Sequence, residues 1–306
     1  MTAAAASPPV VTARTVVVGV DGSESSKRAL SWAARQAART GAPLLVAAAW
    51  TMPASSWGVP VAAYVDPADL EEAARRLVQA AIRTTRSELG DAAPAIQSAV
   101  LPGPAPDALL GLAAHASTLV VGSRGRGGFA SLTLGSVATA CAHHTPVPLV
   151  VVPGDAGTPD DGTREVVVGV DDSAGGRAAL RWAAAQAAAA GIGLRIVHAS
   201  ILMDPPPRPV PPADPADRTP AEQLRAALDQ VVADELGAEA AGLPATVVTV
   251  PLPATEALLQ ESKDASMLVV GSRGRGGFLG LRLGSVSEKC LHHVSCPIVI
   301  VPTPAA

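Results

Sequence analysis

The sequence has 306 residues, of which 48% are apolar and 16% are charged, with a formal net charge of −4. This composition excludes a disordered chain, and the negative balance disfavours a general nucleic-acid binder, which needs a dominant cationic surface. The length allows two ordinary domains with separate cores. Because only 2% of the residues are aromatic, those cores must be built from Val, Leu, Ile and Ala.

The N-terminal segment and the cysteines bear on the cellular compartment. The segment MTAAAASPPVVTART has no charged region followed by a long apolar core, so we expect a disordered lead and not a signal peptide. No run approaches the roughly 18 apolar residues of a membrane span. The three cysteines, Cys141, Cys290 and Cys296, form no disulfide framework. We therefore expect a cytoplasmic protein without membrane contact.

Strands and helices alternate through the first half of the chain. Strands are predicted at Thr15–Val20, Leu44–Trp50, Ala95–Leu101, Leu119–Val121 and Val147–Val152. Helices are predicted from the capping residues Ser25 and Ser26 to Gly41, at Pro67–Gly90, at Asp107–Ala116 and from Ser136 to His143. This order is typical of βαβ units, in which right-handed crossovers build a doubly wound parallel sheet.

The same order then restarts, which indicates an internal duplication. The segment VVVGVDGS at 16–23 returns as VVVGVDDS at 166–173, and RALSWAARQAA at 28–38 returns as AALRWAAAQAA at 178–188. The segment between the copies is rich in Pro, Gly and Asp, as in a linker. We predict a first domain at 14–153, a linker at 154–163 and a second domain at 164–302, both α/β.

A glycine-rich segment is the most informative part of each copy. LVVGSRGRGGFASLTLGSV at 119–137 and LVVGSRGRGGFLGLRLGSV at 268–286 differ only at three positions. In each, a strand enters a loop that ends where a helix is predicted to begin, at Gly135-Ser136 and Gly284-Ser285. Such a loop presents backbone amides and the positive end of a helix dipole, which is how α/β proteins hold phosphate.

Two common nucleotide motifs do not fit this segment. A P-loop needs a lysine after its glycines, and a dinucleotide fingerprint needs G-x-G-x-x-G in the first strand-to-helix turn. The pattern present is G-x-x-G, nine residues, then G-S, twice. Together with VGVDGS, the A-L-x-W-A helix and a final V-x-V-V-P-type strand, it resembles the tandem, ATP-binding form of the universal stress protein family across nearly the whole chain.

The resemblance implies two Rossmann-like domains, each with a five-stranded, mainly parallel sheet that binds ATP, usually with Mg²⁺. It assigns Asp21 and Asp171 to the nucleoside and places backbone at Ala47 or Val197 near the adenine edge. The other implied binding residues are Gly19, Gly122, Ser123, Arg124, Gly125, Arg126, Gly127, Gly128, Gly135, Ser136 and Val137. In the second domain they are Gly169, Gly271, Ser272, Arg273, Gly274, Arg275, Gly276, Gly277, Gly284, Ser285 and Val286.

Structural roles compete with these assignments. Gly19 also fits a packing glycine, Asp21 and Asp171 also fit turn aspartates, and the loop arginines also fit solvated charges. The repeated motif Cys141-Ala-His143-His144 contains zinc-type ligands, but a helix end accounts for it better, and we predict no metal site. The turn containing Gly103 has no glycine in the second copy, VPLPATE, so the two sites are not expected to be equal.

Three functions remain open from the sequence. We expect an ATP-binding, regulatory stress-response protein, because no paired acid and base or activated nucleophile is recognisable. A slow Mg²⁺-dependent ATPase and an interaction scaffold without nucleotide turnover are the alternatives. The duplication also favours a pseudo-twofold domain pair or a homodimer, through the strands at 148–152 and 297–301. The proline-rich loop at 204–220 fits a stiff spacer better than a ligand for a proline-binding domain.

Overall fold

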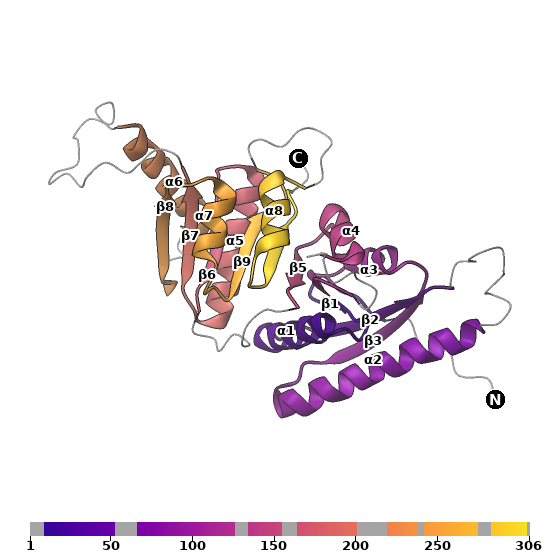
Figure 1. The fold of residues 1–306 in the computed structure, drawn as a ribbon. Coiled ribbons are helices and arrows are strands. Elements are labelled where there is room, and N and C mark those ends of the chain that lie inside the picture. Colours follow the sequence, from indigo (N-terminus) through magenta and orange to yellow (C-terminus); the bar gives the residue numbers. More distant parts are fainter. Residues whose placement is uncertain are drawn as a thin grey trace, which may run out of the picture. The chain divides into compact units, whose positions relative to one another are not determined.

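A computed structural model describes residues 9–52, 66–125, 134–154, 164–200, 219–237, 242–274 and 283–304. The chain divides into two compact units, Met1–Asp155 and Ala156–Ala306, each of which has its own sheet and helices (Figure 1). Among the described residues, no helix combines the length and the apolar character needed to cross a membrane.

The first unit is a parallel sheet with helices on both faces. Its elements are β1 (Val16–Gly19), α1 (Glu24–Thr40), β2 (Leu44–Trp50), α2 (Pro67–Leu89), the 3₁₀ turn η2 (Gly90–Ala92), β3 (Ile96–Pro102), α3 (Ala105–Ala113), β4 (Thr118–Gly122), α4 (Ser136–His144) and β5 (Leu149–Val152). The strand order is β3-β2-β1-β4-β5, and each neighbouring pair is parallel. Helices α1 and α2 pack together, as do α3 and α4.

The second unit repeats this topology. Its elements are β6 (Val166–Gly169), α5 (Ala174–Ala190), β7 (Leu194–Ala199), α6 (Pro220–Leu236), β8 (Ala245–Val250), α7 (Ala254–Glu261), β9 (Met267–Gly271), α8 (Ser285–His293) and β10 (Ile298–Val301). The order is β8-β7-β6-β9-β10, again parallel throughout. The prediction of two duplicated, doubly wound α/β domains with mainly parallel sheets is confirmed.

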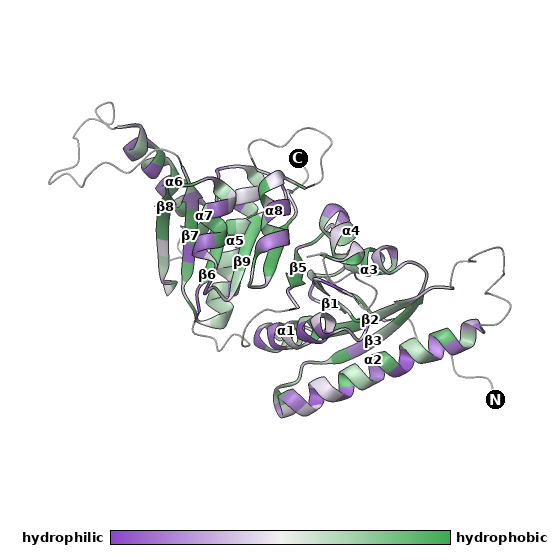
Figure 2. Cartoon of the chain, viewed as in Figure 1, coloured by the Kyte–Doolittle hydropathy of each residue, from purple (hydrophilic) through white to green (hydrophobic). Residues whose placement is uncertain are grey.

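Aliphatic strands between alanine-rich helices form the two cores. Figure 2 shows the strands largely in the green of hydrophobic residues, whereas α2 carries both hydrophilic and hydrophobic residues. In the first unit β1 and β4 are buried along Val16–Val18 and Leu119–Val121. Helix α1 faces them with the buried residues Ala29, Leu30, Ala33, Ala34 and Ala37. Small side chains let this helix lie close to the sheet, so the scarcity of aromatic residues is compatible with a packed core.

The ends of the first helix show how local sequence fixes its length. Ser23, and not Ser25 or Ser26 as predicted, is the N-cap of α1, because its hydroxyl accepts a hydrogen bond from the Ser26 amide. At the other end Gly41 adopts φ 60° and closes α1, as predicted. Gly191 does the same for α5 with φ 66°. A left-handed residue at this position favours glycine, which explains the recurrence of glycine in both copies.

Each unit also has a contact that allows no side chain. A Cβ atom on Gly122, at the end of β4, would lie 2.7 Å from the Ser25 carbonyl carbon and 2.8 Å from the Ser26 nitrogen of α1. A Cβ atom on Gly271, at the end of β9, would lie 2.6 Å from the Gly175 carbonyl carbon of α5. These obstacles are backbone atoms, so the strand end and the helix start must separate if either glycine is replaced.

We expect Gly122→Ala and Gly271→Ala each to lower the free energy of unfolding by about 1–3 kcal/mol, because overpacking forces backbone shifts. Urea-induced unfolding followed by circular dichroism measures this loss. Gly111→Ala is the matched control, because Gly111 lies within α3 and a Cβ there meets nothing within 4 Å. That control should gain up to about 1 kcal/mol from helix propensity. Equal stability of Gly122→Ala and the wild type would contradict the packing argument.

Candidate functional site

In each unit a cavity lies beyond the carboxyl ends of the strands, where doubly wound sheets bind ligands. The first cavity has a volume of about 560 Å³ and the second about 480 Å³. The predicted residues that line the first are Gly19, Asp21, Gly122, Ser123, Arg124, Gly125, Gly135, Ser136 and Val137. Those that line the second are Gly169, Asp171, Gly271, Arg273, Gly274, Gly284, Ser285 and Val286.

A few predicted residues are not among these linings. Ser272 is buried behind the second cavity, where its hydroxyl accepts a hydrogen bond from the Thr303 amide at 3.1 Å. Its counterpart Ser123 accepts one from the Gly154 amide at 3.2 Å. Both hydroxyls therefore tie the glycine loop to the chain that follows the last strand of the unit. Arg126, Gly127, Gly128, Arg275, Gly276 and Gly277 lie outside the described residues.

The aspartates of both units use one carboxylate oxygen to build a turn. Asp21 Oδ1 accepts hydrogen bonds from the Ser23 amide at 2.9 Å and from the Ser23 hydroxyl at 2.6 Å. Asp171 Oδ1 accepts from the same groups of Ser173, at 3.2 and 2.6 Å. The turn role considered from the sequence is therefore real. An ionised carboxylate has about four lone-pair positions, so the two hydrogen bonds of the turn do not exhaust the acceptor capacity of either aspartate.

The second oxygen of each aspartate lies over the glycine loop. A Cβ atom on Gly125 would be 2.7 Å from Asp21 Oδ2, and one on Gly274 would be closer still to Asp171 Oδ2. The second glycine of each G-x-x-G motif thus lets the loop pass under the carboxylate without displacing it. This contact brings together the two motifs that the sequence places about a hundred residues apart.

The start of α4 presents backbone amides to the first cavity. Gly135 is its N-cap and, having no side chain, makes no capping hydrogen bond to its first turn. Helix geometry leaves the amides of Ser136, Val137 and Ala138 without an intrahelical acceptor. The Gly135 amide donates to the Ser123 carbonyl at 2.7 Å, which fixes the helix start against the end of β4. In the second unit Gly284 and Ser272 repeat this bond at 2.7 Å, at the start of α8.

Among the described residues, neither packing nor backbone strain explains why position 135 is glycine. Its φ of −85° and ψ of 159° suit any residue. The atoms nearest to an added Cβ, Arg124 Cα and Ser123 O, would both be 3.4 Å away, so a side chain needs only a small adjustment. Gly284 has nearly the same surroundings, with its nearest atoms at 3.4 and 3.5 Å. A glycine that the fold does not demand, at a helix start facing a cavity, is expected where a ligand approaches the backbone closely.

Gly19 and Gly169 have a packing explanation instead. A Cβ atom on Gly19 would lie 2.7 Å from Leu109 Cδ1, and one on Gly169 would lie 2.9 Å from Leu258 Cδ2. The two leucines line the walls of their cavities. The glycines at the ends of β1 and β6 therefore make room for α3 and α7, which favours the packing interpretation of Gly19 over direct contact with a ligand.

Several lining residues were not predicted. In the first cavity they include Ser26, Ala49, Ala105, Leu109, Leu134 and Ala138. In the second they include Gly176, Leu258, Leu283, Ser287 and His198, whose Nδ1 donates to the Val170 carbonyl at 2.7 Å. Some of these residues occupy equivalent positions in the two copies, since Ser26 aligns with Gly176 and Ala138 aligns with Ser287. A lining position found in one domain therefore identifies its counterpart in the other. The backbone positions Ala47 and Val197, which the resemblance placed near adenine, also line the cavities.

The repeated Cys-His motif does not form a metal centre in the described parts of the chain, where no three His, Cys, Asp or Glu side chains group suitably. Cys141 and Cys290 lie in the cores, and burial raises the pKa of each thiol to about 12. His144 Nδ1 lies 2.9 Å from the Ala140 carbonyl oxygen within its own helix. The motif thus marks a helix end, the interpretation that the sequence favoured.

Comparisons with known proteins agree with this duplicated architecture. The universal stress protein family profile matches residues 12–153 and again residues 162–302. A universal stress protein of Mycolicibacterium smegmatis is 31% identical over 291 residues, which cover 94% of this chain and 96% of that protein. One of Mycobacterium tuberculosis is 30% identical over 295 residues, with coverage of 93% and 95%.

A solved structure shows the same fold over the whole length. The crystal structure of a universal stress protein from Archaeoglobus fulgidus superposes with a TM-score of 0.67 at 20% identity, covering 95% of this chain and 97% of that one. With two matches to the family profile and full-length relatives of the same organisation, this chain belongs to the universal stress protein family as a tandem, two-domain member.

Proposed function

We propose that this protein binds one ATP, with Mg²⁺, in each domain, and acts as a regulatory protein of the stress response and not as an enzyme with rapid turnover. The observation that carries the proposal is the glycine-capped helix start at each cavity. Gly135 and Gly284 lack a side chain although neither their backbone conformation nor their packing against the described residues demands glycine there.

The phosphates are assigned to this helix start. Amides of the first helical turn point along the axis, and the helix dipole adds partial positive charge at the same end. Arg124 and Arg273 line the same cavities and supply a planar cation suited to phosphate oxygens. Cavities of 560 and 480 Å³ are within the usual range for a small-molecule ligand.

The nucleoside is assigned to Asp21 and Asp171, which follow the first strand of each unit and line the same cavities. An ionised carboxylate accepts hydrogen bonds from ribose hydroxyls and repels phosphate, so it fixes the direction of the ligand. Mg²⁺ would arrive with the triphosphate, and these aspartates are the carboxylates in each lining that suit a metal-bound water. Mg²⁺ would supply charge neutralisation of the phosphates.

We expect bound ATP to be retained without rapid hydrolysis because of the residues that line the cavities. Apart from the aspartates, the first cavity presents Ser, Gly, Arg and aliphatic residues, and the second adds His198. One carboxylate oxygen of each aspartate is engaged in its turn, and His198 Nδ1 donates to the Val170 carbonyl. Fast phosphoryl transfer needs a group that orients the attacking water beside a cation at the transferred phosphoryl group, and the described linings provide no such set.

The site is tested by placing a charge at the helix cap. Gly135→Asp keeps a good N-cap residue but sets a carboxylate against the phosphates, so we expect nucleotide affinity in the first domain to fall at least about 100-fold. Gly284→Asp should do the same in the second. The nucleotide released from denatured protein, counted by mass spectrometry, should fall from two per chain to one in each variant and to none in the double variant.

Gly135→Asn and Gly284→Asn are the matched controls, because they add nearly the same volume without the charge. They should bind more tightly than the aspartate variants, and all four should unfold within about 1 kcal/mol of the wild type. Wild-type protein that binds no adenine nucleotide at millimolar Mg-ATP would refute the proposal and favour an interaction scaffold.

Turnover is tested separately. In single-turnover mixtures with purified protein in excess over Mg-ATP, we expect bound ATP to persist for an hour or longer. Release of phosphate within minutes, lost in Asp21→Asn or Asp171→Asn, would instead support the slow ATPase. Quenched samples analysed for ADP decide between the two.

Location and assembly belong to the same proposal. Three buried, free thiols suit the reducing cytoplasm.

A homodimer of tandem chains is the proposed assembly, on the ground of the duplication seen in the sequence. Light scattering at micromolar concentration should give twice the mass of 30.6 kDa, and a mass equal to it would exclude a stable dimer.

A further inference from the structure

The two domains differ in the turn that carries the site aspartate. In the first domain Gly22 occupies this turn with φ 82°. In the second domain Asp172 occupies it with φ 61°, the one non-glycine residue with positive φ among the described residues. A side chain is disfavoured in this left-handed region, and aspartate is among the few residue types found there. The second turn therefore needs support that the first does not.

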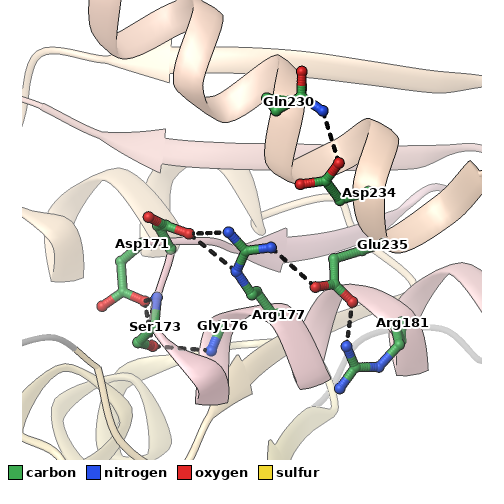
Figure 3. Close-up of polar contacts among 9 residues, drawn as sticks. Asp171, Ser173, Gly176, Arg177, Arg181, Gln230, Asp234 and Glu235 are labelled. Carbon is green, nitrogen blue, oxygen red and sulfur yellow. Dashed lines mark hydrogen bonds and ion pairs between the residues drawn. The ribbon is translucent and has the colours of Figure 1, made fainter.

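Arg177 provides that support from the first turn of α5, and Figure 3 shows its guanidinium reaching Glu235 of α6. Its Nε and Nη2 donate to Asp172 Oδ1 at 3.0 and 2.5 Å. Its Nη1 donates to Glu235 Oε1 at 3.1 Å, and Glu235 lies near the end of α6 with only 12% of its side chain exposed. The hydrogen bond to Glu235, followed by that to Asp172, raises the pKa of the Arg177 guanidinium above its ordinary value. We call this set, Asp172, Arg177 and Glu235, the α6 clamp.

Arg181 adds a second contact to the same carboxylate. It donates to Glu235 Oε2 from one turn further along α5. Glu235 is thus held by two guanidinium groups of one helix, and its carboxylate cannot swing away without breaking both contacts. Networks of this kind restrict side-chain geometry more than single surface ion pairs do.

The first domain has no equivalent of the clamp in its described residues. Lys27 stands where Arg177 does, is 63% exposed, and pairs with Glu24 of its own helix at 2.6 Å. The first domain instead uses hydroxyl groups at the helix start. Ser25 Oγ donates to the Arg124 carbonyl and accepts from the Arg124 amide at 3.3 Å, which ties α1 to the glycine loop.

Those hydroxyls are absent from the start of α5. Gly175 and Gly176 replace Ser25 and Ser26, and a Cβ atom on Gly176 would lie 2.8 Å from Asp171 Oδ1. Glycine is the least favourable residue after proline for holding a helical backbone, and here two occupy the first turn. Asp171, which lines the second cavity, therefore sits between a left-handed Asp172 and a helix start that has two glycines and is capped by the Ser173 hydroxyl.

We propose that Arg177 is a positioning residue of the second nucleotide site. By joining Asp172 to Glu235, it holds the turn from Asp171 to Ser173 against α6 and keeps the Asp171 carboxylate at the cavity. The inference rests on the proposed nucleotide binding, and it makes α6 a support of the second site alone. The first site, with Gly22 and its serines, is independent of any such clamp.

The test measures Mg-ATP binding by calorimetry in the Gly135→Asp background, where only the second site remains. We expect Arg177→Gln to weaken Mg-ATP binding about tenfold. Such a loss corresponds to a variant in which only about a tenth of the molecules hold the turn in the conformation that binds. Adding Asp172→Gly to Arg177→Gln should restore affinity to within about threefold of the parent, because glycine removes the need for support. Glu235→Gln, which releases α6 but leaves Asp172 paired, should give an intermediate loss.

Controls separate this idea from general destabilisation and from the proposed function itself. Lys27→Gln in the Gly284→Asp background, where only the first site remains, should leave Mg-ATP affinity unchanged. Thermal unfolding of all variants should show whether any loss reflects folding, and a structural defect would not be rescued by Asp172→Gly. Unchanged affinity in Arg177→Gln, or no rescue, overturns the clamp while leaving nucleotide binding intact. A parent that binds no Mg-ATP overturns both.

Discussion

The contact between a strand end and a helix start determines where everything else in each domain lies. Gly122 against Ser25 and Ser26, and Gly271 against Gly175, bring β4 and β9 so close to their helices that no methyl group fits. This approach places the glycine loop beneath the aspartate that follows β1 or β6, and it directs the start of α4 or α8 toward the same space. The cavity lies beside this contact, in the crevice beyond the carboxyl ends of the strands of a doubly wound sheet.

The glycines of this chain fall into classes that sequence spacing alone does not separate. Gly41 and Gly191 satisfy a left-handed backbone, whereas Gly19 and Gly169 make room for leucine side chains. Neither reason applies to Gly135 and Gly284, and both stand at helix starts that face a cavity. At the site, the residues with the least structural justification are therefore the most informative about a ligand, and this is why the proposed function rests on them.

The sequence was sufficient to predict the architecture, and most of the described residues that it assigned to a site line the two cavities. Buried parallel strands require continuous aliphatic runs, and Val16–Val18 or Leu149–Val152 supply them, so their order along the chain predicts the fold. The cap of α1 was misassigned because Ser23, Ser25 and Ser26 are all good caps, and only the extended backbone of Ser23 distinguishes it. Leu109 was missed because its place at the cavity depends on contacts between segments distant along the chain.

The two domains share the arrangement of the aspartate turn but stabilise it through different contacts. Both domains retain an aspartate bonded to a serine two residues on, and both lay its second oxygen over a loop glycine. The first domain secures this arrangement locally, with Gly22 and the Ser25 hydroxyl. The second lacks both, and its turn is held by Arg177 through a carboxylate on α6. A site stabilised from outside its own loop is sensitive to whatever displaces that helix, whereas a locally secured site is not. Two copies of one motif thereby differ in their dependence on the rest of the protein, while the aspartate, the glycine loop and the capping glycine of each cavity stay the same.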